Sequence, residues 1–349
     1  MAYTTIDNGS EHFNTVLWSG DGNTGRTISG VGFQPDWTWI KRRGSSTYSH
    51  ALLDSNRGGG KALSSDNTDA ENTNNNILSS WNSDGFVIAL SDVSAFSNTS
   101  GHTYVGWNWK ANGGTTSSNT DGSITSTVQA NTTAGFSIVT YTGTGSNATV
   151  GHGLGKKPNF IFIKDRDNSK SWVVYNSHLT ALKRLNLDTT SASVNASEFQ
   201  DTEPTTSVFS IATDNNVNGS SQDYVAYCFA EIEGYSKFGS YTGNGSSDGT
   251  FIYTGFRPAW LIGKRTDGSG NSWFMFDNKR DTANVMDNYL YANESGAENT
   301  GTGRVDFLSN GFKWRNTAQA WNGSSNTYIY MAFAENPFVS SSGVPVIAR

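Results

Sequence analysis

The chain has 349 residues, of which 35% are hydrophobic and 15% charged, and its formal net charge is −6. The basic residues are scattered, so the chain lacks the positive surface that binding to a nucleic-acid backbone requires. No apolar segment is long enough to span a bilayer, and the first residues lack the basic and apolar regions of a secretory signal. We therefore expect synthesis in a cytoplasm, with no nucleic-acid partner and no membrane insertion.

One motif occurs three times: a turn rich in Gly and Thr, a proline, a short apolar strand and a lysine. The copies end at Lys41, Lys164 and Lys264. The copies are separated by roughly a hundred residues, which is too long for a solenoid repeat and typical of a small domain. After each lysine come an apolar run and, later, a closing aromatic strand. The repeats therefore predict three homologous units.

The apolar segments are short runs of Val, Ile, Phe, Trp and Tyr, bounded by Gly, Asn, Asp or Pro, which is typical of strands joined by polar turns. Apolar stripes with a helical period are absent. The sequence thus predicts an all-β protein of three tandem homologous small β-sandwich units, of jelly-roll or lectin-like type, with little helix. Both faces of the strand before each lysine are apolar, so we expect it to be covered on both sides, with the lysine at its solvent-facing end.

The composition between the units predicts the domain boundaries. A segment rich in Gly, Ser and Thr follows the first unit and has the character of a flexible connector. The second boundary is short, so we expect units 2 and 3 to pack more rigidly together than units 1 and 2. The predicted segments are unit 1 (1–112), a polar linker (113–127), unit 2 (128–235), unit 3 (236–336) and an extended C-terminal tail (337–349).

The many aromatic residues suggest two alternative roles. Flat rings stack on sugars, but aromatic residues that alternate within a recurring strand are more often part of the core. Trp81, Trp314 and Trp321 lie in polar surroundings and are the better candidates for surface residues that bind a ligand. The single cysteine, Cys228, lies in an apolar run and is expected to be a buried free thiol.

No catalytic pair of carboxylates is apparent. Thirteen residues after the recurring lysines come Asp54, Ser177 and Asp277, so the two aspartates occupy corresponding positions in different units and are not partners in catalysis. Each is followed three residues later by an arginine, which favours a local turn or ion pair.

No metal or cofactor site is predicted either. The five histidines lack the spacing of metal ligands, and His50 corresponds to aromatic positions in the other units, so it is expected to pack rather than to bind. The acidic segment 66–71 could offer oxygen ligands to calcium, but its spacing is not that of an EF-hand. A solvated turn is the simpler interpretation of this segment. The sequence therefore predicts no metal and no cofactor.

Four motifs of the first unit are Gly32-Phe-Gln-Pro-Asp-Trp-Thr-Trp-Ile-Lys, Leu53-Asp-Ser-Asn-Arg-Gly, Ser83-Asp-Gly-Phe and Tyr104-Val-Gly-Trp-Asn-Trp-Lys. Together they resemble a repeat unit found in structural proteins of marine bacteriophages, many of them uncharacterised or described as tail-fibre-like. The resemblance covers nearly the whole chain and implies location in the virion after synthesis in the host cytoplasm, with other virion proteins as partners. It supplies no catalytic or binding residues.

Three functional hypotheses follow. The first is a non-enzymatic virion protein, a tail fibre or adhesin module that contributes to attachment to the host surface, with a cell-surface glycan as a candidate partner. The second is a structural subunit, such as a head-decoration protein whose three units cover a threefold position of the capsid. The third is a glycan depolymerase. A homo-oligomer is compatible with all three, and the sequence does not identify a receptor.

Overall fold

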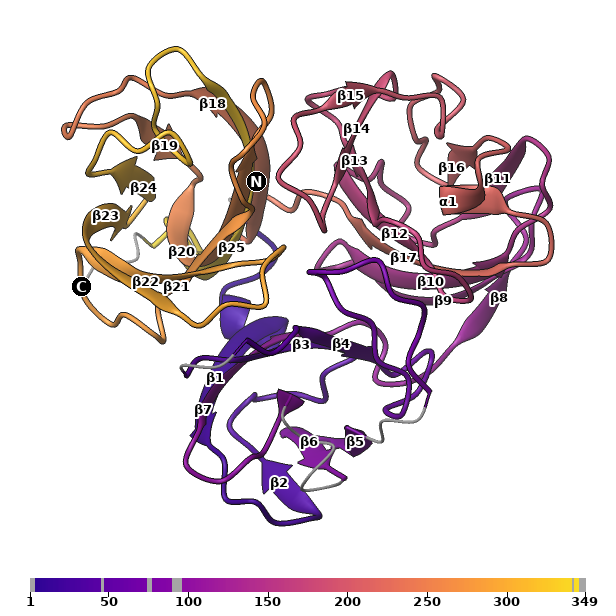
Figure 1. The fold of residues 1–349 in the computed structure, drawn as a ribbon, viewed down its shortest axis with the longest axis horizontal. Coiled ribbons are helices and arrows are strands. Elements are labelled where there is room, and N and C mark those ends of the chain that lie inside the picture. Colours follow the sequence, from indigo (N-terminus) through magenta and orange to yellow (C-terminus); the bar gives the residue numbers. More distant parts are fainter. Residues whose placement is uncertain (1–3, 45–46, 74–76, 90–95, 341, 345–349) are drawn as a thin grey trace.

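The computed structural model describes residues 4–44, 47–73, 77–89, 96–340 and 342–344. It forms three lobes arranged as a triangle (Figure 1). Nearly all regular structure is β-strand, and helix in the described residues is limited to one 3-10 turn and one short α-helix. The prediction of an all-β protein with little helix is confirmed.

Lobe 1 comprises residues 13–109, preceded by the 3-10 turn η1. Its main sheet has the antiparallel order β1-β7-β3-β4, and a second sheet of order β2-β6-β5 covers the outer face. The elements are η1 (Gly9–Glu11), β1 (Phe13–Ser19), β2 (Arg26–Ile28), β3 (Trp37–Arg42), β4 (Ala51–Asp54), β5 (Leu78–Asn82), β6 (Gly85–Ile88) and β7 (Thr103–Trp109).

Lobe 2 comprises residues 117–229. Its main sheet has eight strands in the order β15-β14-β13-β12-β17-β10-β9-β8, and the pair β11-β16 forms a separate sheet. The elements are β8 (Ser117–Asn119), β9 (Ser126–Asn131), β10 (Phe136–Thr142), β11 (Ala148–Gly151), β12 (Phe160–Asp165), β13 (Val173–Asn176), β14 (Lys183–Asn186), β15 (Val194–Asn195), β16 (Val208–Ile211), α1 (Asn215–Asn218) and β17 (Asp223–Phe229).

Lobe 3 comprises residues 236–337. Its eight strands have the order β18-β25-β20-β21-β22-β23-β24-β19 and curl around the outer core of the lobe (Figure 1). The elements are β18 (Ser236–Thr242), β19 (Phe251–Tyr253), β20 (Phe256–Arg265), β21 (Phe274–Asp277), β22 (Met286–Tyr291), β23 (Asn299–Leu308), β24 (Gly311–Trp314) and β25 (Thr327–Pro337).

The same four-strand arrangement occurs in each lobe. The order β1-β7-β3-β4 of lobe 1 corresponds to β10-β17-β12-β13 in lobe 2 and to β18-β25-β20-β21 in lobe 3. Even the register agrees, since the pairs that meet across the two central strands are Trp37 with Trp109, Phe160 with Phe229, and Trp260 with Phe333.

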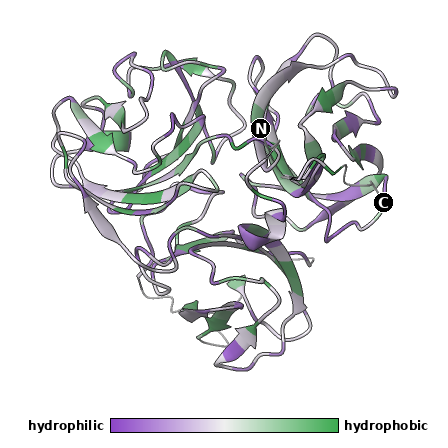
Figure 2. Ribbon diagram, turned by 180° about the vertical axis from the view of Figure 1, so that it is seen from behind, coloured by the Kyte–Doolittle hydropathy of each residue, from purple (hydrophilic) through white to green (hydrophobic). Residues whose placement is uncertain are grey.

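Both faces of each four-strand sheet are buried, as the apolar pattern predicted. The outer faces pack on separate outer cores, one within each lobe. The inner faces share a single central core, which includes Trp37, Trp109, Phe229, Trp260 and Phe333. Figure 2 shows the hydrophobic residues gathered in the strands and the hydrophilic ones in the connecting loops. Each four-strand sheet is thus covered on its outer face by residues of its own lobe and on its inner face by the other lobes.

The segment 113–127, expected to be a polar linker, contributes to the lobe 2 sheet. It contains β8 and the start of β9, which pairs with β10. Its polar side chains do not prevent this, because pairing with β9 satisfies the backbone of β8 and the side chains of this edge strand stay largely exposed. Cys228 is buried as predicted, and burial raises the pKa of its thiol.

Candidate functional site

Two of the three tryptophans predicted to bind a ligand are buried. Trp314 lies on β24 and Trp321 in the turn before β25, with 0% and 2% of their surface exposed. Their rings stack with centroids 5.9 Å apart in the outer core of lobe 3. The prediction that they are surface residues is wrong, because both rings pack against Phe274 and Phe276. The Asn316 side chain also accepts a hydrogen bond from Trp321 Nε1.

The third predicted tryptophan, Trp81, lies apart from the other two. It is on β5 of lobe 1, where it is half-buried against the outer core, and its Nε1 donates to Thr38 Oγ1 at 3.4 Å. Trp81 is therefore in lobe 1, whereas Trp314 and Trp321 are in the buried core of lobe 3. The three tryptophans do not form one aromatic surface on which a sugar could stack.

The recurring lysines connect the lobes. Lys41, Lys164 and Lys264 are fully buried, so the prediction that they face solvent is wrong. Burial lowers the pKa of each to about 8. Each Nζ atom donates to a backbone carbonyl of a neighbouring lobe: Lys41 to Ser295 (2.8 Å), Lys164 to Thr68 (3.2 Å) and Lys264 to Thr190 (3.1 Å).

In each lobe, the residue directly before the last strand of the shared four-strand arrangement (β4, β13 or β21) makes a similar contact through a ring nitrogen. His50, Trp172 and Trp273 reach backbone carbonyls of a neighbouring lobe: Tyr291 (3.1 Å), Ser64 (2.8 Å) and Asn186 (2.9 Å), respectively. Because Trp39 Nε1 donates to His50 Nδ1, we assign the His50 proton to Nε2. Burial holds the pKa of His50 well below its usual range. As predicted, His50 packs in the interior, where its ring lies edge-on to that of Trp39.

A backbone hydrogen bond completes each of these three contacts, which we call joints. The amide groups of Glu71, Ser193 and Glu298 donate to the carbonyls of Arg166 (2.7 Å), Thr266 (2.9 Å) and Arg43 (3.1 Å), respectively. The contacts run from lobe 1 to lobe 2, from lobe 2 to lobe 3 and from lobe 3 to lobe 1. Head-to-tail contacts of this kind form a closed ring, and lobes 1 and 2 are as directly joined as lobes 2 and 3.

Two of the joints contain a buried network of charges. Between lobes 1 and 2, Arg57 Nε contacts Asp54 at 2.6 Å and Arg57 Nη1 contacts Glu71 at 2.7 Å, and Arg166 from lobe 2 also binds Glu71. Tyr227 of lobe 2 donates to Asp54 at 2.7 Å. Burial opposes ionisation of Glu71, but Arg166 and Arg57 outweigh it and keep its pKa below the usual value.

The joint between lobes 3 and 1 repeats this network. Arg280 contacts Asp277 at 2.5 Å and Glu298 at 3.0 Å, and Arg43 of lobe 1 contacts Glu298 at 2.8 Å. The predicted local ion pairs are confirmed. They are not surface pairs, however, because the side chains of Arg57, Asp54, Arg280 and Asp277 are all fully buried.

Strand register corrects the correspondence for lobe 2. Asp54 pairs with Trp37 and Asp277 with Trp260, whereas the residue that pairs with Phe160 is Asn176, not Ser177. The connection between β12 and β13 is therefore one residue shorter than the corresponding connections in lobes 1 and 3. Leu179 consequently corresponds to the two arginines, so the joint between lobes 2 and 3 lacks their charges.

The acidic segment 66–71 belongs to a joint and is not a solvated turn. Asp66 Oδ1 accepts from the His50 backbone amide at 2.9 Å, and Glu71 binds two arginines. In the described part of the chain, no group of three or more His, Cys, Asp or Glu residues is placed to hold a metal ion. Within the same residues, no helix combines the length and apolar character needed to cross a bilayer.

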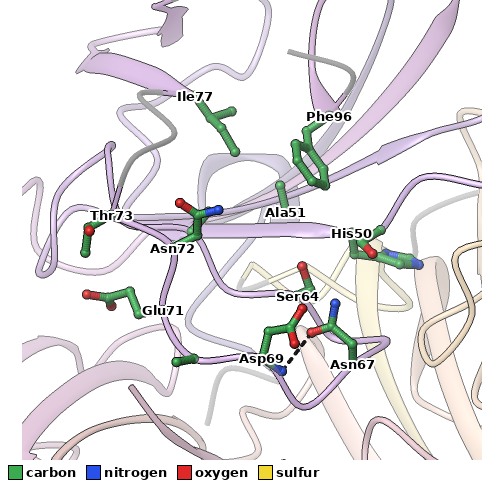
Figure 3. Close-up of a pocket in the computed structure, with 13 residues that line it drawn as sticks. His50, Ala51, Ser64, Asn67, Asp69, Glu71, Asn72, Thr73, Ile77 and Phe96 are labelled. Carbon is green, nitrogen blue, oxygen red and sulfur yellow. Dashed lines mark hydrogen bonds between the residues drawn. The ribbon is translucent and has the colours of Figure 1, made fainter. Parts of the chain in front are cut away.

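A pocket of about 440 Å³ lies beside the first joint, in lobe 1. Figure 3 shows Ile77 and Phe96 on one side of it and Asn67 and Asp69 on the other, with the Asp69 amide donating to Asn67 Oδ1 at 3.1 Å. The pocket has no pair of free carboxylates and no nucleophile oriented by a base among the residues drawn.

One family matches the chain. Its model, described as a domain of unknown function (DUF7483), matches residues 8–337. No curated protein and no solved structure matches. The match covers all three lobes, from η1 to the end of β25.

Proposed function

The chain belongs to the DUF7483 family, and we propose that it is a non-enzymatic structural protein of a bacteriophage particle that contributes to attachment to the host surface, as a tail-fibre or adhesin module. We also propose that the three lobes are tandem homologous units, each a small β-sandwich. The motif resemblance described above supports the virion assignment. The shared strand order and register of the lobes support the repeat.

One structural observation carries the proposal. The lobes are locked together by three sets of corresponding buried contacts around one aromatic core. Contacts buried to this degree make a rigid body, whereas the turns at the outer ends of the strands remain exposed. A rigid scaffold that presents variable polar loops is suited to recognition of a surface.

The arrangement of carboxylates favours a binding role over catalysis. Glycoside hydrolysis requires two carboxyl groups that flank the scissile bond. The tempting pair, Asp54 and Asp277, lies in different lobes, and each carboxylate is buried against its own arginine. A depolymerase would have to use other carboxylates. The depolymerase hypothesis predicts that the purified chain releases reducing sugar from host polysaccharide, and the absence of such release would exclude it.

A head-decoration role is the second candidate, and the closed ring of lobes favours it. One chain with three corresponding lobes could cover a threefold position of a capsid without further copies. This role predicts a copy number per particle close to that of the threefold positions of the capsid lattice, which quantitative mass spectrometry of purified particles would measure. A few copies per particle would exclude it.

Immunogold electron microscopy of the parent particle, with antibody raised to this chain, tests the main proposal. Label at the tail is the expected result. Label over the whole head would favour decoration, and intact particles without label would overturn the virion assignment. Purified chain should also compete with particles for adsorption to host cells, and failure to compete at micromolar concentration would argue against attachment.

A further inference from the structure

A small polar pocket lies at the outer end of the inner face of the lobe 2 sheet, near the joint with lobe 1. Its volume is about 240 Å³. We call it the threonine pocket. It is lined by Thr125, Thr127, Thr140, Tyr141, Thr142, Arg166 and Asp223.

Strand pairing places these side chains next to one another. Thr127 on β9 is directly opposite Thr140 on β10, and Thr142 is opposite Asp223 on β17. The Arg166 amide donates to the Asp223 carbonyl at 2.8 Å, which extends the second row of residues beyond β12. Because alternate residues of a strand share a face, Thr140 and Thr142 lie on the side of β10 that also carries the central core.

Among the described residues, only lobe 2 has a strand that forms the far wall of such a pocket. The residues that correspond to Thr140 are Leu17 on β1 and Ser240 on β18, and those strands are the last of their sheets. In lobe 2, β9 and β8 continue the sheet beyond β10 and provide Thr125 and Thr127. The pocket is therefore required neither by the joints nor by the shared core, both of which the other lobes form without it.

The charges in the pocket are already balanced. Nε and Nη2 of Arg166 donate to Glu71 at 2.9 and 3.0 Å, and Nη1 lies 3.8 Å from Asp223. An anion would have to displace Glu71 from Arg166. A cation could bind only to Asp223, whose carboxylate already lies near Arg166. The threonine pocket therefore favours a neutral ligand.

The remaining groups can exchange hydrogen bonds in both directions. Each threonine hydroxyl has one donor and two acceptor positions. Thr142 Oγ1 donates to Asp223 at 2.8 Å, which fixes its proton and leaves its lone pairs available to a ligand. Thr125, Thr127 and Thr142 are exposed to solvent. Such a wall complements a neutral molecule that is itself rich in hydroxyl groups.

We propose that the threonine pocket binds one sugar residue of a saccharide through its hydroxyl groups. This inference rests on the proposed role in host attachment and adds the class of ligand and the place where it binds. The volume is below that of a typical pocket for a drug-sized ligand, which fits a single ring and not an oligosaccharide. With polar contacts alone, the affinity is expected to be in the millimolar range, about −4 kcal/mol.

Saturation-transfer difference NMR on the full chain tests the proposal, because this method detects weak binding. The probes are glucose, galactose, mannose and N-acetylglucosamine, each added alone. At least one should receive saturation from the wild-type chain. Thr142→Val keeps the shape of the side chain but removes the hydroxyl, and we expect it to lower the saturation of that sugar at least about fivefold, the factor that corresponds to the loss of one hydrogen bond.

Thr242→Val is the matched control, because Thr242 has the corresponding position and exposure on β18 but faces no β9. It should leave the signal unchanged. Thr127→Val, on the far wall, provides a second variant should Thr142→Val disturb the fold. Absence of saturation for all four sugars would overturn the proposal, as would a signal that both pocket variants leave intact.

This test separates the pocket from the proposed function. Label at the phage tail without saturation transfer would remove the sugar site and leave the attachment role. Saturation transfer that depends on Thr142, in a chain absent from the particle, would retain the sugar site and remove the virion role.

Discussion

The joint between lobes 1 and 2 and the joint between lobes 2 and 3 have the same geometry but different chemistry. Both contain a lysine, an indole and a backbone amide that donate to carbonyls across the joint. The first also buries Arg57 with two carboxylates, whereas the second has Leu179 at the corresponding position. The backbone contacts and the aromatic core are therefore sufficient to join two lobes without the charges.

This difference shows what the charged network adds. Replacing a buried ion pair by apolar residues is often neutral for stability, but removing one partner leaves an uncompensated charge and is costly. A network that spans two lobes therefore penalises any arrangement in which they are misaligned. We interpret the charges in the joint between lobes 1 and 2 and in the joint between lobes 3 and 1 as a constraint on the relative orientation of the lobes.

The largest expected effect comes from breaking the charged network. Arg57→Met should leave Asp54 and Glu71 buried with less positive charge and lower the free energy of unfolding by about 3–5 kcal/mol. Urea denaturation followed by tryptophan fluorescence measures it. A loss below about 1 kcal/mol would mean that the network is dispensable. Replacing Asp54 and Arg57 together by apolar residues should cost less than Arg57→Met alone.

Acid should also destabilise the chain, through buried histidines. Burial lowers the pKa of His152 to about 4 and that of His50 well below 6.5. Because both pKa values are lowered on folding, the contribution of these histidines to the free energy of unfolding is complete above pH 6.5 and is lost as the pH falls toward 4. His152 alone should lower the free energy of unfolding by roughly 3 kcal/mol over this range.

Urea titrations at about pH 7 and about pH 5 test this dependence. His152→Gln should reduce the difference between the two titrations, since the amide cannot take up a proton. A free energy of unfolding that is the same at both pH values in the wild-type chain would contradict the prediction.

The joint between lobes 2 and 3, which has no buried arginine network, should be less sensitive to substitution. Leu179 is only partly buried against the central core, so Leu179→Ala should cost about 1–2 kcal/mol, less than a fully buried leucine. The same urea titration that measures Arg57→Met gives the comparison. A cost equal to that of Arg57→Met would show that the two joints differ in composition but not in vulnerability.

The smallest expected effect per residue concerns the joint lysines at alkaline pH. Their pKa values fall from 10.5 to about 8 on folding, so the unfolded chain binds more protons in this interval and stability rises with pH. The gain should be about 1 kcal/mol per lysine between about pH 8 and 9.5. Above pH 10, buried tyrosines with raised pKa values act in the opposite direction.

Lys264→Met isolates one of these lysines. It should reduce the pH-dependent gain by about a third, because the other two joints keep their lysines. An unchanged slope in this variant would show that the lysines are not the groups that titrate. Unfolding free energies of wild type and variant at the two pH values are sufficient for the comparison.

Several features of the fold could be predicted from residue patterns. Short apolar runs bounded by Gly and Asn predicted strands, and the alternation in segments such as Trp37–Arg42 predicted burial on both faces. The apolar run around Cys228 predicted a buried thiol. These features depend on local periodicity and composition, which a linear sequence contains in full.

The candidate residues show where local patterns fail. Trp314 and Trp321 have polar neighbours in the sequence, but their rings pack against Phe274 and Phe276 of β21. The lysines end apolar strands and so resemble solvent-facing ends. They can be buried because carbonyls from another lobe, such as that of Thr68, accept hydrogen bonds from their ammonium groups. Polarity along the chain does not reveal which distant segment packs against a residue.

The recurrence of the lysine, the apolar strand and the aspartate was available from the sequence alone, because each is set by spacing within one unit. Only the tertiary structure decided that these residues join lobes, that Asn176 replaces Ser177 in the correspondence, and that polar strand β9 walls a pocket beside Thr140. The physical reason is that a buried donor or charge is stable only with a partner, and in this protein the partners come from another lobe, up to 255 residues away in the sequence.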